Sequence, residues 1–242
     1  MAGIEEPFWR IWVYLAETPL LGLTVTLSAY LAGDWLYRRA GLNPLANPVL
    51  IAVILLVGLL LVTGTDYPTY FEGAQFVHFL LGPATVALAV PLYRQFRAVK
   101  REALPLLLAL LCGSLTAAGS AVAIAWALGA SLETLLSLAP KSVTTPVAMG
   151  IAEQIGGLPS LTAVLVILTG IAGAVLAPHT LNLLRIRDWK ARGFALGVTA
   201  HGIGTARALQ IDEVAGAFSG LAMGLNALAT AALLPLLIRL LF

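Results

Sequence analysis

The 242-residue sequence has little charge: only 11% of its residues are Asp, Glu, Lys or Arg, whereas 60% are hydrophobic. A soluble domain carries roughly 25% charged residues, so this composition excludes an ordinary soluble protein. The mean hydropathy of +0.93 agrees with that exclusion. The net charge is only +2, and nothing in it suggests binding to nucleic acid, whose phosphates are neutralised by many basic residues.

Cysteine and histidine are also scarce. The single cysteine, Cys112, excludes an intrachain disulfide and a cysteine-based metal site. His78, His179 and His201 lie far apart, and no HxxH or CxxC spacing occurs, so we expect no metal centre. A nucleophile–base arrangement, paired carboxylates, a phosphate loop and a cofactor fingerprint are all missing, so we expect neither an enzyme nor a cofactor. Residues 1–7 lack a basic leader and a cleavage site, which predicts no signal peptide.

Most basic residues stand in three short clusters between long apolar runs. The clusters hold ten of the fourteen Lys and Arg residues: Arg38, Arg39, Arg94, Arg97, Lys100, Arg101, Arg185, Arg187, Lys190 and Arg192. Basic loops of polytopic membrane proteins stay in the cytoplasm. The loop 64–73 carries Asp66 and Glu72 and no basic residue, so it falls outside. The pattern predicts a multi-pass protein of the plasma (cytoplasmic) membrane with its N-terminus outside.

The apolar runs predict an all-α polytopic protein with about six full spans, because a helix needs about 20 apolar residues to cross the hydrocarbon core. The runs cover residues 18–37, 49–63, 74–93, 104–128, 158–184 and 214–242. The aromatic segment before them, 8–14, is expected to lie in the membrane interface.

Two further segments, 131–157 and 191–212, do not fit as ordinary spans. They contain KSVTTPVAMGIAEQIGG and GFALGVTAHGIGTARALQID, apolar at the flanks and polar or small in the middle. The charge pattern puts both ends of the first outside and both ends of the second inside. Re-entrant hairpins from opposite faces satisfy this, as do discontinuous crossing helices if one neighbouring span is reassigned. A loose similarity between residues 142–145 and 197–200 leaves an inverted repeat, as in transporters, open.

The polar residues of the first segment surround a proline. Pro146 disfavours helix at Thr145 and so frees N–H groups and hydroxyls that can bind a carboxylate. An ordinary proline break, in which the Ser and Thr side chains bond to their own backbone, is the alternative. Glu153, an isolated carboxylate, is either a proton carrier or a solvated residue at the outer end of the hairpin. From this segment we expect substrate contacts from Ser142, Thr144, Thr145 and Pro146, and a proton or charge relay through Lys141 and Glu153.

The second segment carries a histidine and an arginine. His201 can bind an anion when protonated or relay a proton, or it is simply a packed, hydrogen-bonded side chain. Arg207 can hold a carboxylate in a bidentate manner, in which case Arg207→Ala abolishes transport, or it snorkels to the cytoplasmic end. From this segment and the last run we expect substrate contacts from Thr199, His201, Gly202, Gly204, Thr205, Arg207 and Asn226. We also expect Thr145 and His201 to face one another near the membrane midplane.

At these same residues the chain resembles the LrgB/CidB family. The resemblance is carried by KSVTTPVAM (141–149), EQIGGLPSLTAVLVILTGIAGAV (153–175) and ALGVTAHGIGTARAL (195–209), and its specific part covers about 140–236. It implies an antiholin-like protein linked to murein hydrolase export and cell lysis. It equally implies a small-monocarboxylate carrier, because relatives include a plastid glycolate/glycerate translocator and bacterial proteins tied to pyruvate. Many bacterial members work beside a small LrgA/CidA-like membrane protein.

We therefore expect a secondary carrier for a small monocarboxylate such as pyruvate, glycolate or glycerate, in one version proton-coupled. The alternative is an antiholin-like regulator that acts with an LrgA/CidA-like partner. Residues 1–128 are expected to form a scaffold and residues 129–242 the transport region. The expected partners are the organic anion, membrane lipid and a second copy of the chain in a homodimer, with no nucleic acid.

Overall fold

The structure, a computed structural model, describes residues 19–43, 46–80, 93–94 and 96–241. Throughout these residues the regular elements are helices, with no strand, so the all-α expectation is confirmed for the described part of the chain. The chain divides into two compact units, Met1–Ala87 and Leu88–Phe242, which are described separately.

The first unit contains three described helices: α2 (Pro19–Arg39), α3 (Pro48–Thr63) and α4 (Tyr67–Phe79). Helix α3 begins after Asn47, whose side chain accepts from two backbone N–H groups of the first turn, and ends at Gly64 with a φ of 64°. Helix α4 begins inside the loop predicted at 64–73, since Pro68 suits the first turn of a helix. A 2.7 Å hydrogen bond between Thr26 Oγ1 and the Tyr70 hydroxyl joins α2 to α4.

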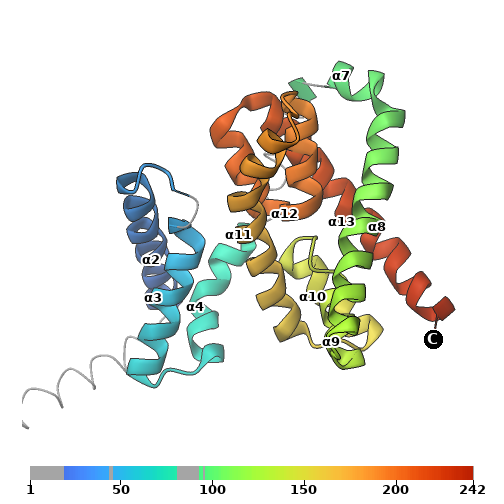
Figure 1. The fold of residues 1–242 in the computed structure, drawn as a ribbon. Helices are drawn as coiled ribbons and strands as arrows, with labels where there is room; N and C mark the ends of the chain where they lie inside the picture. Colours follow the sequence, from blue (N-terminus) through green and yellow to red (C-terminus); the bar gives the residue numbers. More distant parts are fainter. Residues whose placement is uncertain (1–18, 44–45, 81–92, 95, 242) are drawn as a thin grey trace, which may run out of the picture. The chain divides into compact units, whose positions relative to one another are not determined.

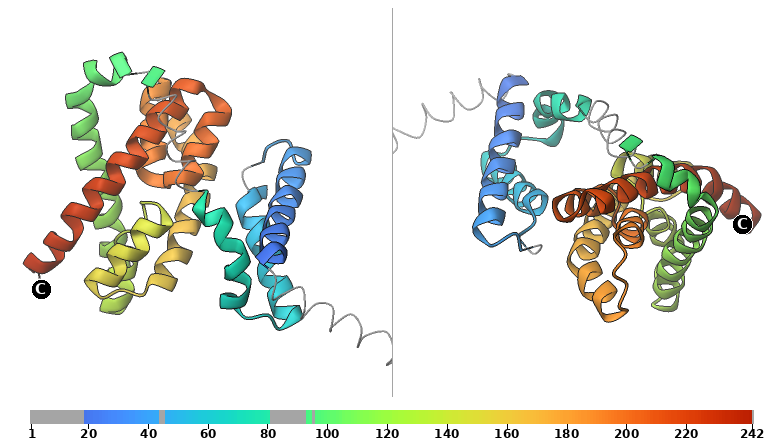
Figure 2. Two further views of the ribbon diagram at one scale, coloured as in Figure 1. Left: turned by 180° about the vertical axis from the view of Figure 1, so that it is seen from behind. Right: turned by 90° about the horizontal axis from the view of Figure 1, so that it is seen from above.

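The second unit contains α7 (Phe96–Arg101), α8 (Ala103–Ala127), α9 (Leu132–Leu138), α10 (Thr145–Ile155), α11 (Pro159–Leu183), α12 (Trp189–Ile211) and α13 (Glu213–Leu241). Figures 1 and 2 show the α9–α10 hairpin at one end of this unit and the loop between α11 and α12 at the other. The two unusual segments therefore enter the unit from opposite ends. The first is a helix–turn–helix, and the second is one helix with an internal break.

Helices α12 and α13 pack with their backbones in close contact. A Cβ added at Gly193 would lie 2.1 Å from the Ala215 carbonyl oxygen, and one at Gly197 would lie 2.2 Å from the Ser219 carbonyl oxygen. The small-residue face of α12 therefore serves helix packing. Phe218 of α13 is fully buried in a core with Leu110 and Phe194, so α8, α12 and α13 share one apolar centre.

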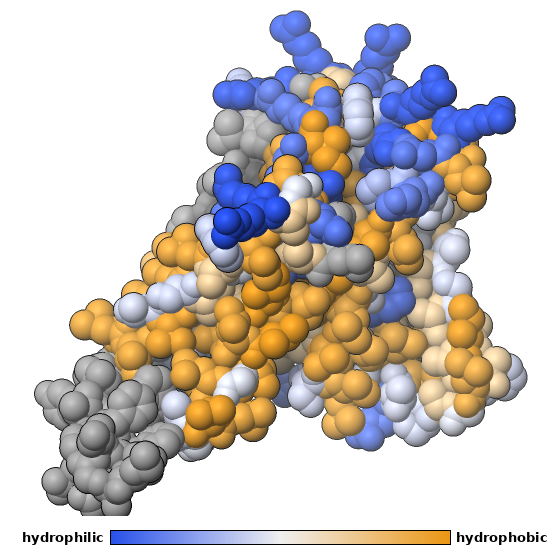
Figure 3. All heavy atoms as spheres, turned by 60° about the vertical axis from the view of Figure 1, so that its left-hand side comes forward, coloured by the Kyte–Doolittle hydropathy of each residue, from blue (hydrophilic) through white to orange (hydrophobic). Residues whose placement is uncertain are grey.

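Within the described residues three helices are long and apolar enough to cross a membrane, at 103–127, 159–183 and 213–240. Figure 3 shows hydrophobic residues over much of the visible surface, as lipid contact requires. These observations support a multi-pass membrane protein, while the count of about six spans stays a prediction. The expected run 74–93 lies largely outside the described residues, and the aromatic segment 8–14 lies wholly outside them.

Helix α8, which the sequence grouped with the earlier spans, belongs to the second compact unit. It contacts α9, α12 and α13 there. The division of labour between a scaffold at 1–128 and a transport region at 129–242 stays a prediction.

Candidate functional site

The second segment breaks at His201, where φ is 41° and ψ is −129° inside α12. A non-glycine residue in such a conformation costs about 1–3 kcal/mol, so surrounding contacts must hold it. His201 is buried, and its Nε2 lies 3.0 Å from the Val166 carbonyl oxygen of α11. Gly170 makes room for the ring, because a Cβ there would lie 2.8 Å from His201 Cε1.

The first segment turns between α9 and α10. Helix α10 begins at Thr145 with Pro146 in its first turn, so the proline starts a helix where its missing N–H is harmless. Thr144 precedes the helix and makes no side-chain capping bond. Within the turn, Lys141 Nζ donates to Ser142 Oγ at 3.2 Å. The polar groups of this segment therefore stand at a helix start, close to a lysine.

Asn226 of α13 joins the two breaks. Its Nδ2 donates to the Ser142 carbonyl at 3.0 Å and to the Val198 carbonyl at 3.1 Å. Because both partners are acceptors only, they set which way the amide points. The side chain is 1% exposed, and its Oδ1 has no hydrogen-bond partner among the described residues. One buried amide therefore ties together the α9–α10 turn and the break in α12.

The hydroxyls of α12 differ in what they do. Thr205 is buried, donates to the His201 carbonyl at 2.8 Å and lies 3.0 Å from Ser219 Oγ. It therefore connects the break to α13 on the C-terminal side of His201. Thr199 is exposed on the opposite side of the break and donates only to the Ala195 carbonyl, at 2.7 Å. Thr199 is therefore the hydroxyl of this helix that a ligand can reach.

A cavity of about 500 Å³ opens beside the two breaks and is called the Lys141 cavity below. It is lined by Ala117, Ser120, Lys141, Ser142, Thr169, Ala172, Gly173, Leu176, Ala177, Thr180, Leu181, Ala195 and Thr199. One ammonium group and several hydroxyls thus converge on a space between α8, α11, α12 and the α9–α10 turn. A cation with hydroxyl donors is the chemistry that recognises a small oxyanion.

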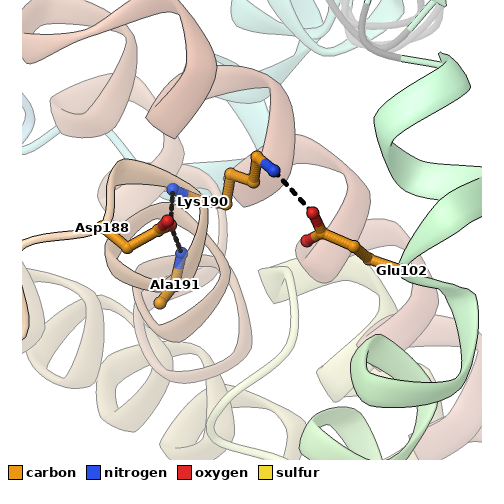
Figure 4. A network of polar contacts seen from close by, with 4 residues as sticks. All are labelled: Glu102, Asp188, Lys190 and Ala191. Atoms are coloured by element: carbon orange, nitrogen blue, oxygen red, sulfur yellow. Dashed lines mark hydrogen bonds and ion pairs between the residues drawn. The ribbon is translucent and has the colours of Figure 1, made fainter.

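A second cavity of about 460 Å³, called the Lys190 cavity, lies along the same helices. It is lined by Glu102, Pro105, Leu106, Ala109, Gly113, Asp188, Lys190, Ala191, Phe194, Ala195, Val198 and Thr199. Figure 4 shows its charged end: Lys190 Nζ pairs with Glu102 Oε1 at 2.5 Å, and Asp188 Oδ1 accepts from the backbone N–H groups of Lys190 and Ala191 in the first turn of α12. The two cavities share Ala195 and Thr199 as lining residues.

Several predicted site residues lie outside both cavities. Glu153 is exposed near the end of α10, and Pro146 is exposed at its start. Arg207 is half-buried beyond the break, with Nη1 3.5 Å from Gln210 Oε1. Of the remaining predicted residues, Lys141, Ser142 and Thr199 line a cavity, and His201, Thr205 and Asn226 form the framework between the breaks. Thr144, Thr145, Gly202 and Gly204 flank the breaks without lining either cavity.

Sequence reasoning missed Ser120, Thr169 and Thr180, which line the Lys141 cavity. A signal was present, because Thr169, Gly173, Ala177 and Thr180 recur at helical spacing in the otherwise apolar α11. Such a polar and small stripe on a membrane helix marks a face turned away from lipid. Across the described residues, no group of three or more His, Cys, Asp or Glu side chains could hold a metal ion.

A family model described as "LrgB-like family" matches residues 26–240. The chain belongs to the LrgB-like family. The match is wider than the specific part expected at 140–236 and covers helices of both compact units.

Curated relatives of this LrgB-like protein agree with the assignment. It is 42% identical to the uncharacterized protein YxaC of Bacillus subtilis (strain 168), over 85% of this chain and 89% of that one. It is 33% identical to the holin-like protein CidB of Staphylococcus epidermidis (strain RP62A), over 83% and 87% of the two chains. It is 31% identical to the antiholin-like protein LrgB of Bacillus mycoides (strain KBAB4), over 90% and 95%. No solved structure matches the chain.

Proposed function

We propose that this LrgB-like protein is a membrane carrier for a small monocarboxylate, such as pyruvate, glycolate or glycerate. The observation that carries the proposal is the Lys141 cavity, where one ammonium group and the hydroxyls of Ser120, Thr169 and Thr199 stand among mostly apolar residues that line an open space of about 500 Å³ beside two broken helices. Ionisable groups inside membrane proteins are costly and mark substrate paths. Broken helical elements are the usual framework of a transporter's substrate site.

The geometry supports different roles for the expected residues. Lys141 and Ser142 are the groups best placed to meet a carboxylate, and Thr199 can bind its second polar group. Asn226, His201 and Thr205 hold the two breaks around that cavity. Arg207 lines neither cavity, so its expected contact with the carboxylate gives way to Lys141 in this proposal.

Uptake of radiolabelled pyruvate, glycolate and glycerate into proteoliposomes tests the proposal. Lys141→Gln should weaken uptake about 10–150-fold, because a hydrogen bond to a charged group contributes about 1.5–3 kcal/mol. Lys100→Gln is the matched control, since Lys100 is exposed in α7 and lines neither cavity. Unchanged uptake by Lys141→Gln contradicts this site, and loss of uptake only in Arg207→Ala moves the site to Arg207. Absence of uptake of all three acids by the wild type contradicts the carrier itself.

A second function, an antiholin-like regulator of lysis, is favoured by the names of two relatives. CidB is called holin-like and LrgB antiholin-like, and these names point to this role more directly than to a carrier. In this version the chain acts with a small LrgA/CidA-like membrane protein. Complementation of cells that lack the native protein distinguishes the two functions. If the protein is a regulator, the wild type and Lys141→Gln restore the normal lysis rate equally well. A carrier whose transport controls lysis restores it only with Lys141 intact.

A further inference from the structure

We propose that the Lys190 cavity and the Lys141 cavity are two stretches of one aqueous route, which leads along α8 from the cytoplasm to Lys141. The proposal rests on the carrier function above and adds its entry path. It also assigns Gly113 as the residue that sets how large an anion can pass.

Continuity along α8 is the first observation. Glu102, Leu106, Ala109 and Gly113 line the Lys190 cavity, and Ala117 and Ser120 line the Lys141 cavity. Steps of three or four residues place all of these side chains on one face of a helix. Opposite this face, Ala195 and Thr199 of α12 belong to both cavities. The two cavities therefore lie along the same face of α8 and have Ala195 and Thr199 of α12 as common lining residues.

The small residues in the middle of the route are the second observation. Small residues line it on α8, namely Ala109, Gly113 and Ala117, and Gly113 faces Val198: a Cβ at Gly113 would lie 3.2 Å from Val198 Cγ1. A larger side chain at Gly113 would press against Val198 and narrow the passage. Short apolar stretches between wetter chambers act as gates in membrane pathways, and here Ala109, Gly113 and Val198 form an apolar stretch between the charged end and Lys141.

The charged end shows which way the route opens. Glu102 and Lys190 pair there, each side chain 35% exposed, and Asp188 lies beside them. The same end carries the clusters at 94–101 and 185–192, which the positive-inside rule places in the cytoplasm. An excess of basic side chains near an entrance raises the local concentration of anions. The route is thus an inward-open path for a small anion.

Thiol accessibility tests the path without measuring transport. Cys112 is exposed and lines neither cavity, so Cys112→Ser gives a cysteine-free background. Into it we place Ala109→Cys and Ala117→Cys on the route, and Gly119→Cys as control, because Gly119 lines neither cavity and nothing lies within 4 Å of a Cβ there. Only a thiolate reacts with a charged methanethiosulfonate, and a thiol in lipid does not ionise. We expect Ala109→Cys and Ala117→Cys to react when the reagent is added at the cytoplasmic face, and Gly119→Cys not to react.

A blocking substitution then tests continuity. Gly113→Leu should slow the labelling of Ala117→Cys at least about tenfold, the effect of roughly 1.4 kcal/mol of added barrier, and leave Ala109→Cys unchanged. Gly119→Leu is the matched control and should change neither rate. The route is overturned if Ala117→Cys reacts only from the opposite face, reacts no faster than Gly119→Cys, or is insensitive to a folded Gly113→Leu variant.

If Gly113→Leu does not fold, the labelling of Ala117→Cys with Gly113 intact still tests the route. Labelling only from the opposite face, or labelling no faster than that of Gly119→Cys, still overturns it. Failure of the carrier function is distinguishable, because labelling needs only an open path. Vesicles that label as expected but take up none of the three acids retain the route and reject the substrate class. Vesicles that transport but show no labelling of Ala117→Cys retain the carrier and reject the route.

Discussion

The two breaks in the second unit are made in different ways. The turn before α10 ends in a proline that begins a helix, so mainly nearby residues in the chain produce it, with Asn226 as one distant contact at Ser142. The break at His201 lies inside α12, where the chain would otherwise continue as a helix. It is held by residues far away in sequence, since Val166 lies 35 positions from His201 and Asn226 lies 28 positions from Val198. A local break is robust to single changes, whereas a break held by distant contacts depends on each of them.

Loss of Asn226 should have the largest effect, because this residue connects the two breaks. Asn226→Leu leaves the Ser142 and Val198 carbonyls without their present donor, and each unsatisfied buried group costs about 1–3 kcal/mol. We expect a strong loss of thermal stability in detergent, together with loss of uptake. Thr230→Val is the control, because Thr230 is buried one turn later on α13, while the donor to Ser142 and Val198 is Asn226. Equal stability of the two variants would mean that the breaks hold without the bridge.

A methyl group at Gly170 should disturb the second break alone. The added Cβ would lie 2.8 Å from both His201 Cε1 and Ile203 Cδ1, and overpacking of this kind costs about 1–3 kcal/mol. Gly150→Ala in α10 is the matched change at the first break, where nothing lies within 4 Å of the new Cβ. It should leave stability unchanged or raise it by about 0.5–1 kcal/mol. The melting temperature should therefore fall for Gly170→Ala and stay the same or rise for Gly150→Ala, and a similar fall in both variants contradicts the comparison.

Removal of Pro146 should have a small effect, because backbone hydrogen bonds at 138–143 and the bond from Asn226 also hold the turn before α10. The proline is exposed in the first turn of α10, a position that it fits. Pro146→Ala should cost only about 0.4–1 kcal/mol, through the greater entropy of the unfolded chain. Uptake and labelling of Ala117→Cys should stay near the wild-type values. A loss of stability as large as that of Asn226→Leu would show that the proline, and not the bridge, maintains the turn.

The contrast between the breaks also explains which features of the fold and the site can be predicted from the sequence. The positions of both breaks, the helical class and the family follow from local signals: Pro146, the glycines beside His201, and long apolar runs. The residues that bond to each break cannot be found in this way, because the pattern of one chain segment does not show which distant side chain packs against it. Asn226, which donates to the Ser142 carbonyl, lies 84 positions away in the sequence. The cavities were missed for the same reason, since Ser120, Lys141 and Thr169 meet only when α8, the turn and α11 pack together.

The smallest effect is expected at the charged end of the Lys190 cavity, where the pair between Glu102 and Lys190 joins the starts of α8 and α12. Both side chains are 35% exposed, and exposed pairs contribute only about 0–1 kcal/mol. Glu102→Gln and Lys190→Gln should each change the melting temperature little, and the double variant should show little coupling in a double-mutant cycle.

The same two variants should change the rate at which a charged reagent enters the route. Glu102→Gln removes a negative charge from the mouth of the route and should speed the labelling of Ala117→Cys by a negatively charged reagent. Lys190→Gln should slow it, and raised salt should reduce both differences, since charge at an exposed mouth is screened. Identical labelling rates in the two variants would show that the charged end of the Lys190 cavity is not the entrance of the route. The Glu102–Lys190 pair would then be only a contact between the starts of α8 and α12.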